Sequence, residues 1–366
     1  MKKKILFIQP FYFFYGHYYG LFNNLVDNLY KIKDLDFLVS VNEKIKNSDF
    51  LIGLKDIQKK AKILTFKSAK KSDSKHNIIK AFFKIIKLKK NYDIFFFYDS
   101  DIPIISILYF IFWPLFYKKK IILYVFYGPE KFNKSIIKRL FIKFFLKFKN
   151  NKIFTRTKYL SSSWQKYFLN NRNISCLECC DYPNVIIRKN KKKGKLKFGV
   201  VGQIRFGKSI EFLSDFFIKN KTQGSFYLIG NFSKDKLKKK FEFINKKNLF
   251  KENFDSPKKN SNKILSLDYI CLMYDDFFDH RQDISTLYLA AKIRSPIICF
   301  NKKGWLLNKV KKYNCGLILN SVKDFKDLPK RNSLRYKKFI NGLVKFDQSE
   351  TGQAKVNFFY NKISNS

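Results

Sequence analysis

The chain has 366 residues, which is more than one ordinary hydrophobic core accommodates and is suited to two domains. Hydrophobic residues make up 46% of it, which lies within the range of globular proteins and is sufficient to bury two cores. Lys and Arg number 75 against 28 Asp and Glu, a formal net charge of +47, but the excess runs along the whole chain beside 43 Phe, as in A/T-biased genomes. Charge alone therefore does not predict nucleic acid as a partner, and it leaves an anionic membrane surface open.

Cysteine usage and the apolar stretches predict where the protein resides. The 6 cysteines form no disulfide framework, and no Cys/His cluster predicts a metal site. The longest apolar stretch, residues 102–117, contains two prolines and is shorter than the roughly 20 residues of a membrane-spanning helix. We expect a cytoplasmic protein, with peripheral attachment to the inner face of the cytoplasmic membrane as an open alternative.

Strand-like and helix-like segments alternate in the first half of the chain. Short apolar runs predict strands over residues 4–9, 36–41, 61–66, 93–98 and 120–126. Apolar residues at helical spacing predict helices near residues 21–30, 76–88, 102–117 and 133–149. The last helix is strongly basic, so that it either presents a solvated face above a core or rests on anionic lipid.

A turn followed by a charge run over residues 182–194 predicts an interdomain linker. Beyond it we expect strands from residue 196 and over residues 225–229, 269–273, 296–300 and 316–319, with helices from residue 210 and over residues 234–244, 285–293 and 304–313. Such alternation implies a parallel sheet in each half. The sequence therefore predicts an α/β fold with two Rossmann-like domains, over residues 1–188 and 189–345, and a helical tail, residues 346–366, that packs back on the first domain.

The loop after the first strand is the first candidate for chemistry, because ligands bind beyond the carboxyl ends of parallel strands. It contains Gly16, which permits close backbone approach to a ligand, and His17, whose neutral imidazole is a competent base near pH 7. No GxGxxG fingerprint is present, so NAD and FAD are not predicted. We take His17 as the catalytic candidate, with a structural histidine as the alternative.

The turn between the strand from residue 196 and the next helix is the most informative segment. Gly202, Gln203, Arg205 and Lys208 converge there on a helix N-terminus. Free backbone N–H groups and two cations suit a diphosphate. A plain turn with surface cations is the alternative interpretation.

Residues 202–209 also match the GxxxxGK[ST] pattern of P-loop NTPases. The intervening residues QIRF lack the small side chains that a phosphate-wrapping loop needs. A P-loop NTPase therefore remains a rival hypothesis.

A polar, acidic loop containing Arg281 precedes the helix that opens at Ser285 and Thr286. The N–H groups and hydroxyls of that helix start predict a second anion site, with Ser285 as the N-cap. An acidic solvated loop and an ordinary cap explain the pattern equally well.

Taken in order, these segments resemble the GT-B glycosyltransferases, in particular the group 1 enzymes of family 4. Residues 199–213 look like that family's donor-phosphate segment, residues 287–319 like the stretch that closes the donor site, and residues 10–29 like its glycine-containing acceptor-side loop. The resemblance implies two domains facing across a cleft, with a nucleoside-diphosphate sugar as donor and no metal or other cofactor. It implies His17 near the reacting sugar and donor binding by Gly16, Gly202, Gln203, Arg205, Lys208, Arg281, Ser285 and Thr286.

One departure from the family pattern concerns two glutamates, spaced eight residues apart, that many members carry. Alignment on Pro296 places Arg281 and Leu289 at those positions. The resemblance implies a hexosyltransferase of the retaining type, acting on a lipid-linked or cell-envelope glycan in polysaccharide biosynthesis. Two alternatives stay open: the P-loop NTPase, and a non-catalytic basic protein that binds membrane or RNA on a decayed transferase fold.

Overall fold

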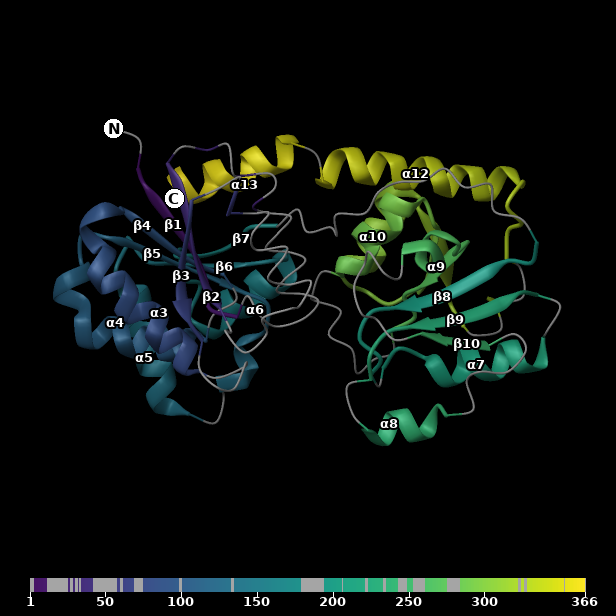
Figure 1. Cartoon of the computed structure of the whole chain (residues 1–366), viewed down its shortest axis with the longest axis horizontal. Coiled ribbons are helices and arrows are strands. Elements are labelled where there is room, and N and C mark those ends of the chain that lie inside the picture. Colours follow the sequence, from purple (N-terminus) through teal and green to yellow (C-terminus); the bar gives the residue numbers. More distant parts are fainter. Residues whose placement is uncertain are drawn as a thin grey trace. The chain divides into compact units, whose positions relative to one another are not determined.

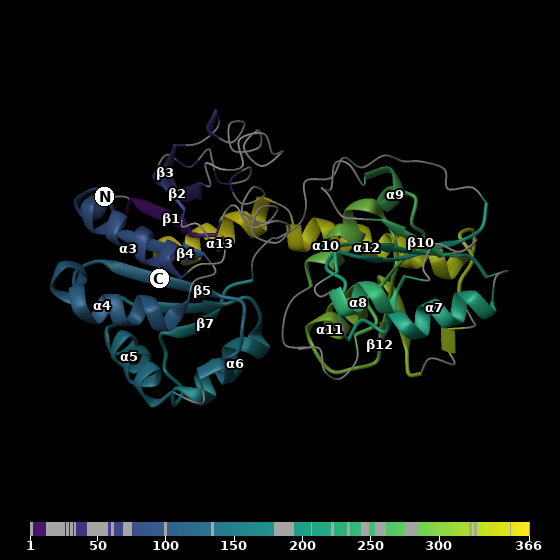
Figure 2. The same ribbon diagram turned by 60° about the horizontal axis from the view of Figure 1, so that its bottom comes forward.

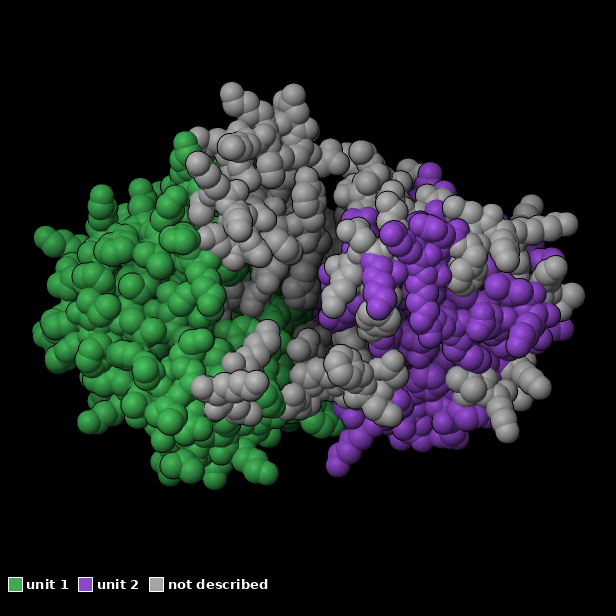
Figure 3. Space-filling model, turned by 90° about the horizontal axis from the view of Figure 1, so that it is seen from below, with its two compact units in different colours: residues 1–180, 353–366 green, residues 181–352 purple. Residues whose placement is uncertain are grey.

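The computed structural model describes residues 3–11, 26, 29, 32, 34–41, 58–59, 62–68, 75–98, 101–132, 135–178, 194–205, 207–220, 223–232, 235–242, 249–252, 261–274, 284–321, 324–325, 328–351 and 353–365. The chain forms two compact units, which Figure 3 distinguishes by colour. Unit 1 comprises Met1–Cys180 and Gln353–Ser366, and unit 2 comprises Asp181–Gly352.

Unit 1 is built on a parallel sheet of seven described strands in the order β3-β2-β1-β4-β5-β6-β7. The strands are β1 (Ile5–Gln9), β2 (Leu35–Val41), β3 (Ile63–Lys67), β4 (Ile94–Tyr98), β5 (Lys120–Val125), β6 (Lys152–Thr155) and β7 (Ile174–Cys176). Their central members are apolar except for Gln9 at the end of β1 and Lys120 at the start of β5, because both faces of the sheet are covered. Ile5 and Phe7 of β1 enter one hydrophobic cluster, whereas Leu6 and Ile8 enter the other.

The helices that follow β3, β4 and β5 pack on one face of this sheet (Figures 1 and 2). The described helices are α3 (His76–Leu88), the 3-10 turn η1 (Lys89–Asn91), α4 (Ile102–Phe116), the 3-10 turn η2 (Pro129–Phe132), α5 (Ile136–Lys147) and α6 (Lys158–Tyr167). Asp101 caps α4 by accepting a hydrogen bond from the N–H of Ile104 at 3.2 Å. Inside the helix, Pro114 accompanies a kink at Phe112, whose φ and ψ are −108° and 17°.

The C-terminal helix α13 (Gln353–Asn365) belongs to unit 1 and covers the opposite face of its sheet. Val356, Phe359 and Ile363 are buried there, and the ring of Phe359 lies 5.8 Å from that of Phe96 on β4. The predicted boundary at residue 345 falls inside α12 (Leu334–Thr351), and the division between the units comes at the end of that helix. The last helix of the chain thereby completes the core of the first unit.

Unit 2 repeats the architecture with six described parallel strands in the order β10-β9-β8-β11-β12-β13. The strands are β8 (Lys197–Val201), β9 (Ser225–Ile229), β10 (Leu249–Glu252), β11 (Tyr269–Cys271), β12 (Ile297–Phe300) and β13 (Gly316–Leu319). The described helices that precede α12 are α7 (Ile210–Lys219), α8 (Asp235–Lys240), α9 (Ser261–Leu265), α10 (Ser285–Ile293) and α11 (Trp305–Tyr313). The predicted α/β fold with two parallel-sheet domains is confirmed.

Two buried carboxylates fasten α12 to its neighbours in unit 2. Asp347 lies 2.8 Å from the ammonium of Lys292 on α10, and Glu350 lies 2.7 Å from that of Lys309 on α11. Figure 1 shows α12 passing along α10. Because these ion pairs are largely withdrawn from water, removing one partner would leave an uncompensated charge.

Helix α5 forms within the predicted helix over residues 133–149, and its buried residues are Ile142, Phe145 and Leu146. Ile136, Ile137 and Leu140 are exposed. Most of the predicted helix near residues 21–30, and the predicted linker apart from Gly194, lie outside the described residues.

Candidate functional site

The strand order of unit 2 fixes where a ligand can approach its sheet. From β8 the chain proceeds outward to β9 and β10, and then crosses to β11 on the other side of β8. Such a reversal opens a crevice beyond the carboxyl ends of the two central strands, where ligands bind in parallel α/β sheets. The turn from β8 to α7 and the segment after β11 both begin at this crevice.

The backbone of the β8–α7 turn depends on glycine at two positions. Gly202 has φ +98° and Gly207 has φ +85°, a region that other residues rarely adopt. Between them, Ile204 is fully buried and forms an isolated parallel bridge with Phe232. A methyl group added at Gly230, which follows β9, would overlap the carbonyl oxygen of Gly202. The turn is therefore held tightly against the neighbouring strand connection.

The β8–α7 turn contains both of the predicted cations, one buried and one exposed. Lys208 is buried with 8% of its surface exposed, whereas Arg205 is exposed. Burial, and secondarily the positive charge of Arg205, lower the pKa of Lys208 to about 7. Among the described residues, no carboxylate lies within ion-pair distance of the Lys208 ammonium. A buried cation beside a second cation is the electrostatic setting of an anion site.

Tyr274 joins this pair from the segment after β11 and was not predicted as a site residue. Its side chain is buried and interacts electrostatically with Arg205. Burial raises the pKa of the Tyr274 hydroxyl, which therefore stays protonated and able to donate a hydrogen bond at neutral pH. Its position just beyond the carboxyl end of β11, the strand beside β8, is the signal that would have identified it.

The geometry of the turn does not support a P-loop. The N–H of Gly202 donates to the carbonyl of Ile229 at 2.9 Å, and the N–H of Ile204 donates to that of Asn231 at 2.9 Å. These amides extend the pairing of β8 with β9, whereas a P-loop directs successive amides at the phosphates. Residues 202–209 therefore match the Walker pattern in their sequence but not in their backbone conformation.

The second predicted anion site begins at α10. Here the prediction that Ser285 is the N-cap was wrong, because Ile284 occupies that position with φ −122° and ψ 103°. Ser285 and Thr286 are the first two residues inside the helix. The side chain of Ile284 cannot accept a hydrogen bond, so within the described residues the first amides of α10 receive no side-chain cap from this position. Such a start suits an external anion.

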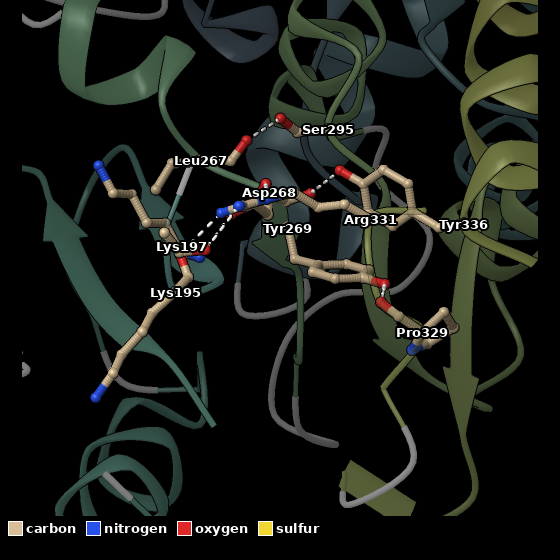
Figure 4. A network of polar contacts seen from close by, with 10 residues as sticks. Lys195, Lys197, Leu267, Asp268, Tyr269, Ser295, Pro329, Arg331 and Tyr336 are labelled. Carbon is tan, nitrogen blue, oxygen red and sulfur yellow. Dashed lines mark hydrogen bonds and ion pairs between the residues drawn. The ribbon is translucent and has the colours of Figure 1, made fainter. Parts of the chain in front are cut away.

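The amino ends of the same strands carry a polar network that holds the sheet (Figure 4). Asp268 is fully buried and accepts two hydrogen bonds from the guanidinium of Arg331, at 2.6 and 2.7 Å. It also accepts the backbone N–H of Lys197 at 2.7 Å. Arg331 in turn donates to the carbonyls of Gly194 and Lys195, each at 2.8 Å. The pair therefore ties the start of β8 to the segment before α12.

Three further hydroxyl groups continue this network (Figure 4). The hydroxyl of Tyr269 donates to the carbonyl of Pro329 at 2.6 Å, and that of Ser295 donates to the carbonyl of Leu267 at 2.6 Å. Tyr336 on α12 donates to the carbonyl of the buried aspartate at 3.1 Å. With the amino ends of β8 and β11 fixed in this way, their carboxyl ends are held in register at the crevice.

The remaining predicted site residues are placed as follows. Gln203 is exposed in the β8–α7 turn. Gly16, His17 and Arg281 lie outside the described residues. In unit 1 the order of strands reverses between β1 and β4, and Gln9 ends β1 at that point. Gln9 is fully buried, and its side-chain nitrogen has no hydrogen-bond partner within the part of the chain that the structure describes. It is a polar residue that sequence reasoning missed.

Over the described ranges, no three His, Cys, Asp or Glu side chains gather in a group that could hold a metal ion. In the same part of the chain, none of the helices combines the length and apolar character needed to cross a bilayer.

Comparison with known proteins supports the fold at low sequence identity. No protein-family model matches the sequence, and no curated protein sequence matches it significantly. Among solved structures, Anabaena HepE with UDP and glucose is 12% identical with a TM-score of 0.66 and covers 100% of both chains. WaaG, a glycosyltransferase involved in lipopolysaccharide biosynthesis, is 12% identical with a TM-score of 0.62, over 99% of this chain and 100% of its own.

The lipopolysaccharide outer core galactosyltransferase WaaB, in its apo form, is also similar. It is 14% identical with a TM-score of 0.59, over 98% of this chain and 99% of its own. These likenesses span both units of the chain and both parallel sheets. The chain has the two-domain GT-B fold of glycosyltransferases.

Proposed function

We propose that this protein is a glycosyltransferase that uses a nucleoside-diphosphate sugar as donor. The observation that carries the proposal is the pair Arg205 and Lys208 in the β8–α7 turn, at the crevice where a GT-B fold receives its donor. HepE, which shares the fold, has been crystallised with UDP and with UDP-glucose. On that likeness we propose UDP as the nucleotide.

The residues of the turn suggest how the donor would be held and activated. When the bond between the sugar and the nucleoside diphosphate breaks, negative charge increases on the phosphate oxygens. Cations beside these oxygens therefore stabilise the transition state more than the ground state. We assign this role to Arg205 and Lys208, with the uncapped amides at Ser285 and Thr286 binding a second phosphate oxygen. Gln203 and Arg281 complete the proposed donor set. No metal ion is required in this scheme, so we expect activity to persist in EDTA.

For the acceptor and the stereochemistry of transfer, our proposals rest on the similar structures and on the sequence resemblance. WaaB and WaaG are named for lipopolysaccharide synthesis, which makes a lipid-linked or cell-envelope glycan the acceptor we propose. From the resemblance of residues 10–29 to an acceptor-side loop, we place Gly16 and His17 near the reacting sugar. The same resemblance suggests hexosyl transfer with retention of configuration.

The test is release of UDP from a panel of UDP-hexoses, with and without cell-envelope glycans. We expect release by the unaltered chain and a loss of about 100-fold in Arg205→Ala combined with Lys208→Met, because each charge-assisted contact contributes to the transition state. The matched control is Lys239→Ala, which removes an exposed cation from α8 in the same unit.

The same assay separates this proposal from a binding protein on a decayed transferase fold. UDP binding without any release from the whole panel would exclude catalysis and favour the binding protein. Equal release of UDP by the double variant and by the unaltered chain would show that Arg205 and Lys208 do not contribute to catalysis.

A further inference from the structure

Helix α5 has two apolar faces, and only one of them is covered. Ile142, Phe145 and Leu146 face the sheet of unit 1. On the other side, Ile136 is 69% exposed, Ile137 is 66% exposed and Leu140 is 59% exposed. A helix that only covered a sheet would carry polar residues at these positions, because exposed β-branched and leucine side chains contribute nothing to the core.

Helix α4 lies beside α5 and extends this apolar surface (Figures 1 and 2). The ring of Phe110 lies 5.2 Å from Phe141 and 4.9 Å from Phe144 of α5, so that the two helices share one outer face. Ile111 is 57% exposed on α4, and Trp113 is 40% exposed near its kinked end. We call this the α4–α5 surface, defined by its exposed residues Phe110, Ile111, Trp113, Leu115, Tyr117, Ile136, Ile137 and Leu140.

The charges around this surface are predominantly positive. Residues 102–177 contain 15 Lys and Arg and one acidic residue, Glu130. Exposed lysines border the apolar residues directly, at Lys138, Lys143 and Lys147 on α5 and at Lys118 after α4. A cluster of apolar side chains bordered by cations, with Trp and Tyr among them, matches the boundary between lipid headgroups and acyl chains.

We propose that the α4–α5 surface is a docking site for an anionic phospholipid bilayer. The apolar tips enter the boundary between headgroups and acyl chains, and the bordering lysines contact lipid phosphates. A second copy of the chain is a poor occupant, because it would bring the same cations against these cations. The inference concerns unit 1 alone and does not depend on the donor site in unit 2.

The first experiment is sedimentation of the full chain with vesicles of phosphatidylcholine alone or mixed with phosphatidylglycerol. Basic residues elsewhere also attract anionic vesicles, so the comparison is made at raised ionic strength, where purely electrostatic binding is screened. We expect binding to the mixed vesicles, weakened about tenfold or more in Ile137→Asp combined with Leu140→Asp.

The matched control introduces the same two charges at exposed leucines elsewhere, in Leu169→Asp combined with Leu334→Asp. All four positions are exposed, so unchanged thermal unfolding is expected of both variants, and UDP binding serves as the check that unit 2 is intact. If the control loses vesicle binding as much as the α4–α5 variant does, the assignment of the surface is overturned. Equal binding by both variants and the unaltered chain would overturn it too.

The second experiment uses the tryptophans of the chain as reporters of depth. Of the 3 tryptophans, Trp164 and Trp305 are buried, so Trp113 is the one that lipid can reach. Phosphatidylcholine brominated on its acyl chains, mixed with phosphatidylglycerol, should quench the fluorescence of the unaltered chain and leave that of Trp113→Phe unquenched. Vesicle binding without quenching would show that the protein contacts only lipid headgroups, and it would overturn the proposal. Binding of an acidic protein to the α4–α5 surface, with no binding of vesicles, would also overturn it.

Discussion

The environment of Lys208 and its proposed role favour opposite protonation states of its side chain. Its burial beside Arg205 disfavours the ammonium form, yet the proposed ligand requires that form. The bound diphosphate supplies the counter-charge that the described residues around Lys208 lack. Ligand affinity and the protonation of this lysine are therefore linked.

The pH dependence of UDP binding should report that linkage. Without ligand the pKa of Lys208 is about 7, and a bound diphosphate raises it. Above pH 7, binding therefore takes up a proton and the affinity for UDP falls as pH rises, by at most about tenfold per pH unit. Calorimetric titration in two buffers of different ionisation enthalpy measures this uptake. Lys208→Met should abolish it, and uptake that persists in this variant would point to another group.

Removing the buried charge should also stabilise the protein without ligand. The folded pKa of Lys208, about 7, lies below its ordinary value of 10.5, so the unfolded chain binds this proton more tightly. The resulting destabilisation is fully present below pH 7 and disappears as pH rises toward 10.5. We expect Lys208→Met to raise the free energy of unfolding by about 1–3 kcal/mol at neutral pH. Urea denaturation checks this, and an unchanged or lower stability would contradict it.

At the level of elements, the β8–α7 turn depends on its contact with the turn after β9. Gly230→Ala would press a methyl group on the carbonyl of Gly202, which cannot move without breaking the pairing that Ile204 makes with Phe232. We expect at least about tenfold weaker UDP binding with a smaller loss of stability. Calorimetry and thermal unfolding measure the two effects. Unchanged UDP binding by Gly230→Ala would contradict this prediction, because it would show that the turn accommodates the added methyl group.

The network at the amino ends of the strands should affect stability alone. Asp268→Asn removes the carboxylate that Arg331 contacts at 2.6 and 2.7 Å and should destabilise unit 2 by about 2–4 kcal/mol. Below the unfolding transition, UDP affinity should stay the same because the proposed donor crevice lies at the opposite ends of β8 and β11. Asp215→Asn, at an exposed position of α7, is the control in thermal unfolding. A loss of UDP affinity in the folded variant would contradict this division of roles.

Sequence patterns predicted those elements in which local signals agree with the tertiary structure. The turn at Gly202 was foreseen because glycines and cations follow an apolar strand. The start of α10 was misjudged, since backbone geometry makes Ile284 the cap although its side chain cannot serve as one. Tyr274 was missed because its closeness to Arg205 follows from the order of the strands, which a sequence does not show.

Helix α5 illustrates another limit. Its 12 residues are apolar on two sides, and periodicity cannot tell which side the sheet covers. The sequence therefore left open whether this helix covers a core or rests on anionic lipid, and the structure exposes Ile136, Ile137 and Leu140. Helix α12 was overlooked, although its buried residues Tyr336, Phe339, Leu343 and Phe346 recur at helical spacing. Its carboxylates form ion pairs with α10 and α11.

At the scale of the whole molecule, two parallel-sheet units divide the proposed tasks. Unit 2 holds the proposed donor crevice, with Arg205 and Lys208 in the turn after β8, while unit 1 carries the α4–α5 surface. The chain returns to unit 1 through α13, whose Phe359 packs on the sheet beside Phe96. The net charge of +47 favours anionic partners in general, so specificity must come from these two sites.

The central claim is that the β8–α7 turn binds the diphosphate of a nucleotide donor, and calorimetric titration of the full chain with UDP tests it most directly. We predict saturable binding by the unaltered chain and by Lys239→Ala, and a loss of affinity of about 100-fold or more in Arg205→Ala combined with Lys208→Met. Absence of UDP binding, or equal affinity in the double variant, would contradict the assignment of the site.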